Sequence, residues 1–242
     1  QKQEEKKVEF KENGFISVSV GDGLTDLFHE LGVDEVIEGG QTMNPSTEDI
    51  LGAIEKIPAK NIYILPNNGN IILAYLLEKT VGVEYHDYIL QDNVMIFKNI
   101  PQGIAAMINF VEGFTPEQNE EAMTEALSEV KSGQVTYAVR DTVIDGKEIK
   151  AGNIMGLSDK TIEIVGTDVV DTTIDLLKKM MDEDMVSAGQ TLGYMGNSGY
   201  GEEGTKEDAE KIAKAIEGID DEMEVEIQYG GQPIYYYFVS VE

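Results

Sequence analysis

The chain has no cysteine and only two histidines among its 242 residues. Without cysteine it can form neither a disulfide nor a thiolate metal site, a usage that fits a protein of the cytoplasm. The histidines, His29 and His86, have no carboxylates arranged near them in the sequence, so neither a catalytic triad nor a zinc site is indicated. We therefore expect a cytoplasmic chain with no catalytic residue and no metal ligand of its own.

Positive charge is also scarce, because 18 lysine and arginine residues stand against 46 acidic ones, giving a net charge of −28. Such a surface repels phosphate groups, which argues against binding of DNA, RNA or anionic lipid. It would instead attract a basic protein partner and speed its arrival. The alternative is that the charge only keeps the surface soluble or adapts it to salt.

No apolar run is long enough to span a membrane, and no charged-then-apolar leader opens the chain, so we expect neither membrane insertion nor a secretory signal. The apolar fraction of 41% is sufficient for a packed core, and the length allows one large or two small domains. The first residue is Gln1 rather than methionine. We interpret the sequence as a fragment of a longer polypeptide or as a processed chain.

Extended runs and helical patterns alternate in the first half of the chain. The strands are expected at residues 15–20, 36–37, 61–65 and 94–97. Each is followed by apolar residues at helical spacing, and Asp22 is a suitable cap for the first of these helices. The repetition predicts a parallel sheet with helices on both faces, in which ligands bind at the carboxyl ends of the strands.

The pattern changes after residues 111–114. A helix opens at Thr115, and the short strands and long helices after it predict a mixed sheet. Strands are expected at residues 135–140, 149–150, 153–157, 161–165, 191–195, 223–227 and 234–241, and helices at 169–182 and after Thr205. We divide the chain into a tail at 1–12, a first α/β subdomain at 13–112 and a second at 113–242.

Loops rich in amide side chains follow predicted strands at residues 39–47, 65–70 and 99–103. Neutral amides cannot act as general bases, but they fix loops, cap helices and hydrogen-bond to partners. Because the carboxyl ends of parallel strands share one edge of a sheet, we expect these loops to form one rim.

Capping and recognition both stay open as roles for these loops. Helix capping alone would explain Asn44, Ser46 and Asn67. Further amide side chains on the expected rim are left without that explanation: Gln41, Asn68, Asn70 and Gln102.

Residues 199–204 match the GxGxxG pattern of dinucleotide-binding turns. Glu202 and Glu203 would face the pyrophosphate, so a Gly-rich connection is favoured over a nucleotide site. Elsewhere, Arg140 and Asp141 are interpreted as an internal ion pair. In the aromatic run at 235–238, alternation predicts that Tyr235 and Tyr237 share one buried side.

Five separated motifs, in order, resemble the C-terminal part of the ATP-using subunit of bacterial fatty acid kinase, a DAK-type, dihydroxyacetone-kinase-like protein. They are Gly-Gly-Gln-Thr-Met-Asn-Pro-Ser-Thr-Glu-Asp at 39–49, Leu-Pro-Asn-Asn at 65–68, Pro-Gln-Gly at 101–103, Ala-Val-Arg-Asp at 138–141 and Gly-Gly-Gln-Pro at 230–233. The resemblance extends from around residue 13 to Glu242.

The resemblance implies a DegV-like, two-domain α/β fold. It also implies that ATP and magnesium are held by an N-terminal kinase domain, so that no cofactor belongs to this chain. The C-terminal region would engage a separate fatty-acid-binding subunit, whose acyl carboxylate is phosphorylated to acyl phosphate for phospholipid synthesis. On this basis the chain is expected to be a non-catalytic docking fragment of a kinase, and the full-length protein a possible homodimer.

DegV-type lipid binders hold the acyl carboxylate with a Thr-Ser-Gln-Pro-Ser loop and a Ser-Gly-Thr loop. Residues 41–46 and 66–70 stand at those places, which makes a free-standing DegV-type fatty-acid carrier the alternative function. Such a carrier would need a long apolar tunnel. The residues expected to bind or dock are Gln41, Thr42, Asn44, Ser46, Asn67, Asn68, Asn70, Gln102, Arg140 and Gln232.

Overall fold

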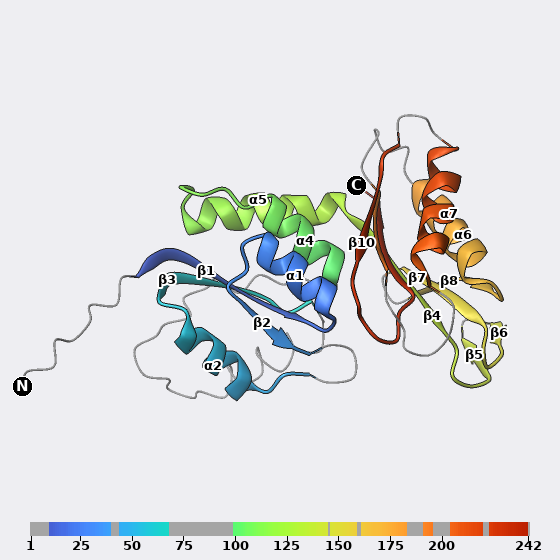
Figure 1. The fold of residues 1–242 in the computed structure, drawn as a ribbon, viewed down its shortest axis with the longest axis horizontal. Helices are drawn as coiled ribbons and strands as arrows, with labels where there is room; N and C mark the ends of the chain where they lie inside the picture. Colours follow the sequence, from blue (N-terminus) through green and yellow to red (C-terminus); the bar gives the residue numbers. More distant parts are fainter. Residues whose placement is uncertain are drawn as a thin grey trace, which may run out of the picture.

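Two sheets lie along the long axis of the molecule in the computed structural model (Figure 1). The structure describes residues 10–39, 44–67, 99–144, 146–158, 161–182, 191–195, 204–219 and 223–241. In this part of the chain, one sheet has three strands in the order β2-β1-β3, and the other has six in the order β10-β9-β11-β4-β7-β8. Helices pack on both sheets, so the predicted α/β class is confirmed.

The three-stranded sheet is parallel, as the alternation of strands and helices predicted. Its strands are β1 (Lys11–Ser19), β2 (Glu35–Glu38) and β3 (Ala59–Leu65). Its helices are α1 (Asp22–Glu30), α2 (Thr47–Lys56), α4 (Ile100–Ile108) and α5 (Pro116–Glu129). Phe15 packs with α1, α4 and α5, whereas Ile16 packs with α2, so the helices cover both faces.

Side chains close in sequence set where three of these helices begin. Ser46 and Asp49 form a capping box at α2, and Thr115 and Gln118 form another at α5. Asn99 caps α4 by accepting a hydrogen bond from the Gln102 N–H at 3.0 Å. These starts were predictable from the sequence because each cap is local.

The predicted cap of α1 by Asp22 is wrong. Asp22 is already helical, and the N-cap position is Gly21, which has no side chain to accept a bond. The Leu24 N–H instead donates to the carbonyl oxygen of Gly230 at 3.0 Å. A loop from the far end of the chain therefore replaces the local cap.

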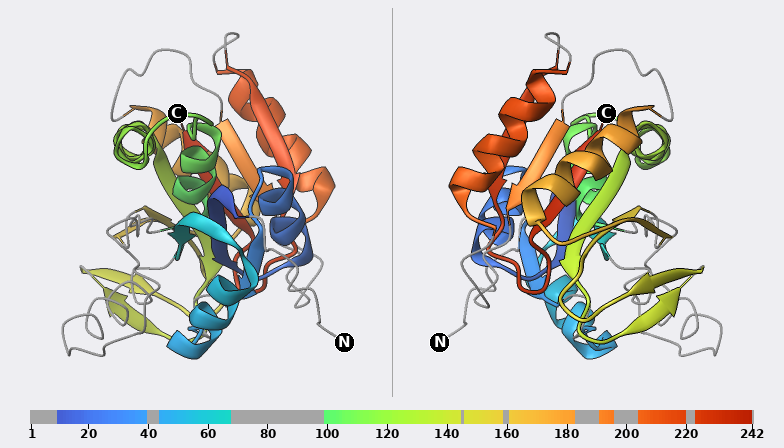
Figure 2. Two further views of the ribbon diagram at one scale, coloured as in Figure 1. Left: turned by 90° about the vertical axis from the view of Figure 1, so that its left-hand side faces the viewer. Right: turned by 90° about the vertical axis from the view of Figure 1, so that its right-hand side faces the viewer.

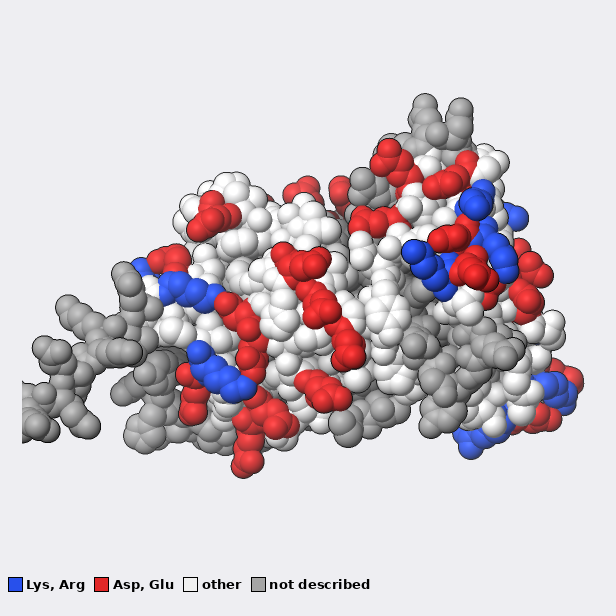
Figure 3. Space-filling model, viewed as in Figure 1, with Lys and Arg blue, Asp and Glu red and all other residues white. Residues whose placement is uncertain are grey.

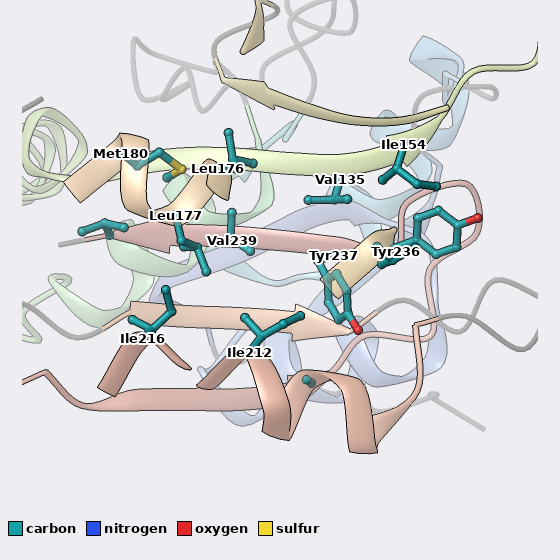
Figure 4. Close-up of a cluster of buried hydrophobic side chains, with 13 residues drawn as sticks. Val135, Ile154, Leu176, Leu177, Met180, Ile212, Ile216, Tyr236, Tyr237 and Val239 are labelled. Carbon is teal, nitrogen blue, oxygen red and sulfur yellow. The ribbon is translucent and has the colours of Figure 1, made fainter. Parts of the chain in front are cut away.

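The six-stranded sheet is mixed, as predicted. Its strands are β4 (Lys131–Tyr137), β7 (Ile154–Ser158), β8 (Thr161–Gly166), β9 (Thr191–Met195), β10 (Val225–Tyr229) and β11 (Tyr237–Val241). Strands β9 and β10 run parallel, and β11 is antiparallel to both β4 and β9. Helices α6 (Val169–Asp182) and α7 (Lys206–Glu217) pack on this sheet through Leu176 and Ile216, which are fully buried (Figure 4).

Burial along the aromatic run at 235–238 differs from the predicted alternation. Tyr236, Tyr237 and Phe238 are all buried. The reason is that β11 lies between β9 and β4 in the middle of its sheet, where both faces are covered. Tyr237 joins the core under α6 and α7, and Phe238 joins the core of the first sheet (Figure 4). Strand β11 thus belongs to two cores.

A two-stranded hairpin projects beside the six-stranded sheet (Figure 1). It consists of β5 (Thr142–Ile144) and β6 (Lys147–Ile149), paired antiparallel. Ile149 is fully buried and packs against Ala138 and Ile162, which holds the hairpin on the sheet.

The proposed subdomain limits remain a prediction. β1 begins at Lys11, inside the expected tail at 1–12. Met123 of α5 is fully buried in the core of the first sheet, although it lies in the expected second subdomain. None of the described helices is long and apolar enough to cross a membrane.

Candidate functional site

The carboxyl end of β1 carries buried hydroxyl groups. Ser17 and Ser19 alternate with apolar residues and, by the pleat of the strand, face the same side as Phe15. Polar side chains are unusual at positions that are buried, because each needs a hydrogen-bond partner there. These two serines mark the place where the apolar core of the first sheet gives way to a polar rim.

Asn67 connects the end of β3 to this rim. Its Nδ2 donates to Ser17 Oγ at 2.9 Å and to the carbonyl oxygen of Val18 at 3.1 Å. Its backbone is left-handed, with φ of 51°, a conformation that asparagine tolerates better than most residues. The side chain is only 7% exposed, so its main role in the described chain is to join two neighbouring strand ends.

The first turn of α4 rests on Asn67. A Cβ atom at Gly103 would approach Asn67 Oδ1 to less than 3.0 Å, so only glycine allows this contact. On the other side of β1, the Gly39 N–H donates to the Ser19 carbonyl oxygen at 3.1 Å. The described parts of the three amide-rich loops therefore meet around the end of β1, as expected from the parallel sheet.

A fourth loop, from the six-stranded sheet, closes the rim. A Cβ atom at Gly21 would lie 2.7 Å from the Gln232 backbone nitrogen, and one at Gly23 would collide with the Tyr229 carbonyl group. The loop continues into a γ-turn, in which the Tyr235 N–H donates to the Pro233 carbonyl oxygen at 2.9 Å. Ile234, the central residue, has φ of 78°, a strained value for a β-branched side chain.

The rim contains hydrogen-bonding atoms that the described part of the chain does not use. Ser19 Oγ, Asn67 Oδ1 and both amide atoms of Gln232 are buried and have no partner there. Gln232 is only 1% exposed. Each unpaired buried group costs about 1–3 kcal/mol, so such groups are retained where they have another use.

The predicted docking residues occupy several different places. Asn44 and Ser46 are exposed, and Gln102 is partly exposed beside Asn99. Arg140 lies at the base of the β5–β6 hairpin, away from the rim, and Gln232 is buried in the rim. The remaining members of the set lie outside the described residues: Gln41, Thr42, Asn68 and Asn70.

The expected ion pair between Arg140 and Asp141 is not formed in the described structure. Asp141 instead accepts a hydrogen bond from the Ala151 N–H at 2.9 Å and pairs with Lys150 at 3.4 Å. These two interactions, the backbone bond first, lower the pKa of Asp141. The GxGxxG turn lies outside the described residues except for Gly204.

Sequence reasoning missed several residues of the rim. Ser17 and Ser19 carried a signal, namely two serines at alternate positions of an otherwise apolar strand. Asn99 Nδ2 also donates to Ser132 Oγ at 2.7 Å, which ties α4 to the start of β4. That pair joins residues 33 positions apart, so no local pattern could have shown it.

Carboxylates dominate the surface beside the rim. Asp22, Asp26 and Glu30 are exposed at four-residue spacing along α1, where acidic side chains follow the helix in Figure 3. Like charges at this spacing destabilise a helix slightly. The described rim itself offers amides, hydroxyls and backbone groups, and these suit recognition by hydrogen bonds better than proton transfer.

Over residues 14–242 the chain matches the FakA-like C-terminal family, which is described as the C-terminal region of a fatty acid kinase subunit. It is 42% identical to protein YloV of Bacillus subtilis (strain 168) over 229 residues, which is 95% of this chain and 39% of YloV. It is also 42% identical to an uncharacterized protein of Staphylococcus haemolyticus over 232 residues, or 96% of this chain and 39% of that protein. The chain thus spans less than half the length of these curated relatives.

Solved structures of similar fold share little sequence with the chain. DegV, a fatty acid binding protein from B. subtilis, gives a TM-score of 0.60 at 10% identity, with 96% of this chain and 99% of DegV covered. Dihydroxyacetone kinase of C. freundii gives 0.60 at 11%, covering 97% and 49%. Fatty acid kinase B3 of Streptococcus pneumoniae, loaded with linoleic acid, gives 0.54 at 14%, covering 82% and 76%. The DegV-like fold is confirmed.

Proposed function

The chain belongs to the FakA-like C-terminal family of fatty acid kinases, and on that premise we propose that it is a docking region without catalytic residues of its own. It engages a separate DegV-type fatty-acid-binding subunit, holding it so that the bound acyl carboxylate can be phosphorylated for phospholipid synthesis. The phosphoryl transfer would take place in the part of the relatives that this chain does not span.

One observation carries the proposal: four loops form a polar rim whose buried hydrogen-bonding atoms are partly unused. Ser19, Asn67 and Gln232 supply these atoms. A fixed arrangement of amide and hydroxyl groups binds a partner with little loss of conformational entropy, because the loops are already ordered by their contacts with each other. Such a rim supports recognition of another protein.

The family implies ATP and magnesium for the kinase domain. The described residues of this chain contain no group of three His, Asp or Glu side chains placed to hold a metal ion. We therefore assign them no part in holding magnesium or the phosphates. Their proposed contribution is to position the partner.

Charge supports a partner with a basic docking face. The chain has a net charge of −28, and acidic side chains gather over α1 and α2 on the face shown in Figure 3. Complementary charge raises association rates and is weakened by salt. A basic face on the fatty-acid-binding subunit would thus be steered toward the rim.

The test is a titration of this chain with the purified DegV-type subunit of the same organism by isothermal calorimetry, at low and at high salt. We expect micromolar binding that weakens as salt is added, and no acyl phosphate when ATP is supplied with the chain alone. Absence of binding at low salt would overturn the proposal. Acyl phosphate formed by the isolated chain would overturn its non-catalytic role.

A free-standing fatty-acid carrier is the second candidate. The unpaired hydroxyl and amide atoms of Ser19 and Gln232 could also serve a carboxylate, and DegV of B. subtilis is a fatty acid binding protein of similar fold. Native mass spectrometry of the purified chain separates the two functions. A retained acyl chain would favour the carrier, and a mass equal to that of the polypeptide favours docking.

A further inference from the structure

The base of the β5–β6 hairpin exposes aliphatic side chains. Val139 is 79% exposed and Val143 is 66% exposed, the two highest values among the large hydrophobic residues that the structure describes. Single exposed aliphatic residues are ordinary, but two on one short segment beside a charged residue have the composition of a contact surface. We refer to Val139, Arg140 and Val143 as the hairpin surface.

Arg140 is the only arginine in the sequence. It is exposed, and within the described residues it makes no ion pair, although the chain has 46 carboxylates. Lysines of the described chain do pair with carboxylates, for example Lys60 with Glu12 at 2.6 Å. The one guanidinium group of this acidic protein is therefore available for a carboxylate outside the chain.

The hairpin surface is held in place from below. Asp141 fixes the neighbouring turn through the Ala151 N–H, and Lys147 donates to the carbonyl oxygens of Ile162 and Glu163 on β8. Isolated two-stranded hairpins are marginally stable, so these anchors are what order it. An ordered surface loses little conformational entropy when a partner binds.

The chemistry of the surface defines what it fits. Arginine presents a planar fork of donors that matches a carboxylate with two parallel hydrogen bonds. The valines on either side favour an apolar surrounding, in which such a pair is shielded from water. The complementary patch is an aspartate or glutamate flanked by aliphatic side chains, the opposite of the basic face expected at the rim.

The position of the hairpin points to the same partner that binds the rim. In Figures 1 and 2 the hairpin and α2 project on the same side of the molecule, so one partner can reach both. Strand β1 begins at the opposite end of the molecule from the hairpin (Figure 1). A polypeptide segment preceding β1 would leave from that far end, which favours a separate protein over the rest of the same chain.

We propose that the hairpin surface is a second contact for the fatty-acid-binding subunit, in which Arg140 pairs with a partner carboxylate flanked by aliphatic residues. This inference rests on the proposed docking function. A basic face attracted to α1 and α2 and a carboxylate held by Arg140 would together fix the orientation of the partner, because like charges disfavour the reversed arrangement.

The test compares binding of the purified fatty-acid-binding subunit to Arg140→Glu, Val139→Ser and the matched control Lys60→Glu by calorimetry. Arg140→Glu and Lys60→Glu change the net charge equally, but Lys60 lies on β3 at the other end of the molecule. We expect Arg140→Glu to weaken binding at least about tenfold, Val139→Ser about threefold, and Lys60→Glu less than about twofold. Thermal unfolding of all three should match the parent, because the substituted side chains are exposed.

Each outcome decides between the two proposals. If the parent binds and the two hairpin variants bind as tightly as it does, the inference is overturned while the docking function stands. If Lys60→Glu weakens binding as much as Arg140→Glu, the effect is net charge alone and the inference is also overturned. If the parent does not bind at low salt, the docking function fails and the hairpin contact with it.

Discussion

Polar groups are satisfied in different ways at the ends of the two sheets. At the six-stranded sheet, Thr205 Oγ1 accepts from the Asp208 N–H at 3.2 Å and Asp168 Oδ1 accepts from the Asp171 N–H at 2.9 Å, each three residues apart. At the rim of the three-stranded sheet, Asn67 bonds to Ser17, 50 positions away, and still leaves Oδ1 unpaired. Local caps stabilise a helix wherever it lies, whereas the rim gives up stability to hold polar groups together.

The largest expected effect tests the closure of the rim. Gly23→Ala places a Cβ atom against the Tyr229 carbonyl group, so the backbone must move, at a cost of about 3 kcal/mol or more in the free energy of unfolding. Urea denaturation measures it. Gly52→Ala in α2 is the control, because nothing lies within 4 Å of that position, and it should stabilise by about 0.5–1 kcal/mol. Equal stability of the two variants would mean that the loop does not close on α1.

The second prediction separates the hydrogen bonds of Asn67 from its backbone conformation. Asn67→Gly keeps the left-handed backbone but loses both bonds, and should cost about 1–2 kcal/mol. Asn67→Ala adds the strain of a left-handed alanine, about 1 kcal/mol more. Chemical denaturation compares them. If glycine were the more destabilising of the two, the left-handed conformation would not be the one this residue adopts.

The third prediction compares unpaired polar atoms of the two regions. Gln232→Leu removes the unpaired amide of the rim, and Tyr237→Phe removes the unpaired hydroxyl of the other core. Both should leave the free energy of unfolding unchanged or raise it by up to about 1 kcal/mol. Only Gln232→Leu should weaken binding of the fatty-acid-binding subunit, by about fivefold. Equal binding by both variants would show that the amide of the rim has no role in recognition.

The smallest effect belongs to a local cap. Lys211, and after it Thr205, lower the pKa of Asp208 from its ordinary value of 3.8. A lowered pKa in the folded state means that the ionised carboxylate contributes stability above pH 3.8 and that this contribution is lost as the pH falls through the folded-state pKa. Asp208→Asn should cost less than about 1 kcal/mol at neutral pH. Its cost should shrink in acid, and a difference that stays constant with pH would contradict this.

The sequence predicted what depends on neighbours in the chain. Helix α6 and strand β9 have the predicted bounds, and Ser46, Thr115 and Thr205 cap the predicted helices. These features follow from apolar spacing and from side chains within one turn of the helix start. The convergence of the amide-rich loops was also predictable, because parallel strands end at a common edge.

The rest depended on which segments meet in space. The cap of α1 comes from Gly230, and the burial of Tyr236 follows from the central position of β11, neither of which is encoded nearby. The exposed Val139 was missed for the same reason, since an apolar residue at the end of a predicted strand is normally taken as core. The functional hypothesis drew on the resemblance, and the structure adds which atoms of the rim remain unused.

Strand β11 places Phe238 in one core and Tyr237 in the other, and it is the last strand in chain order. Neither half can complete its interior until this strand has been synthesised and inserted between β4 and β9. A ribosome-bound intermediate would hold two unfinished interiors at once, so folding should be largely post-translational. The same strand would make the two halves melt together rather than one after the other.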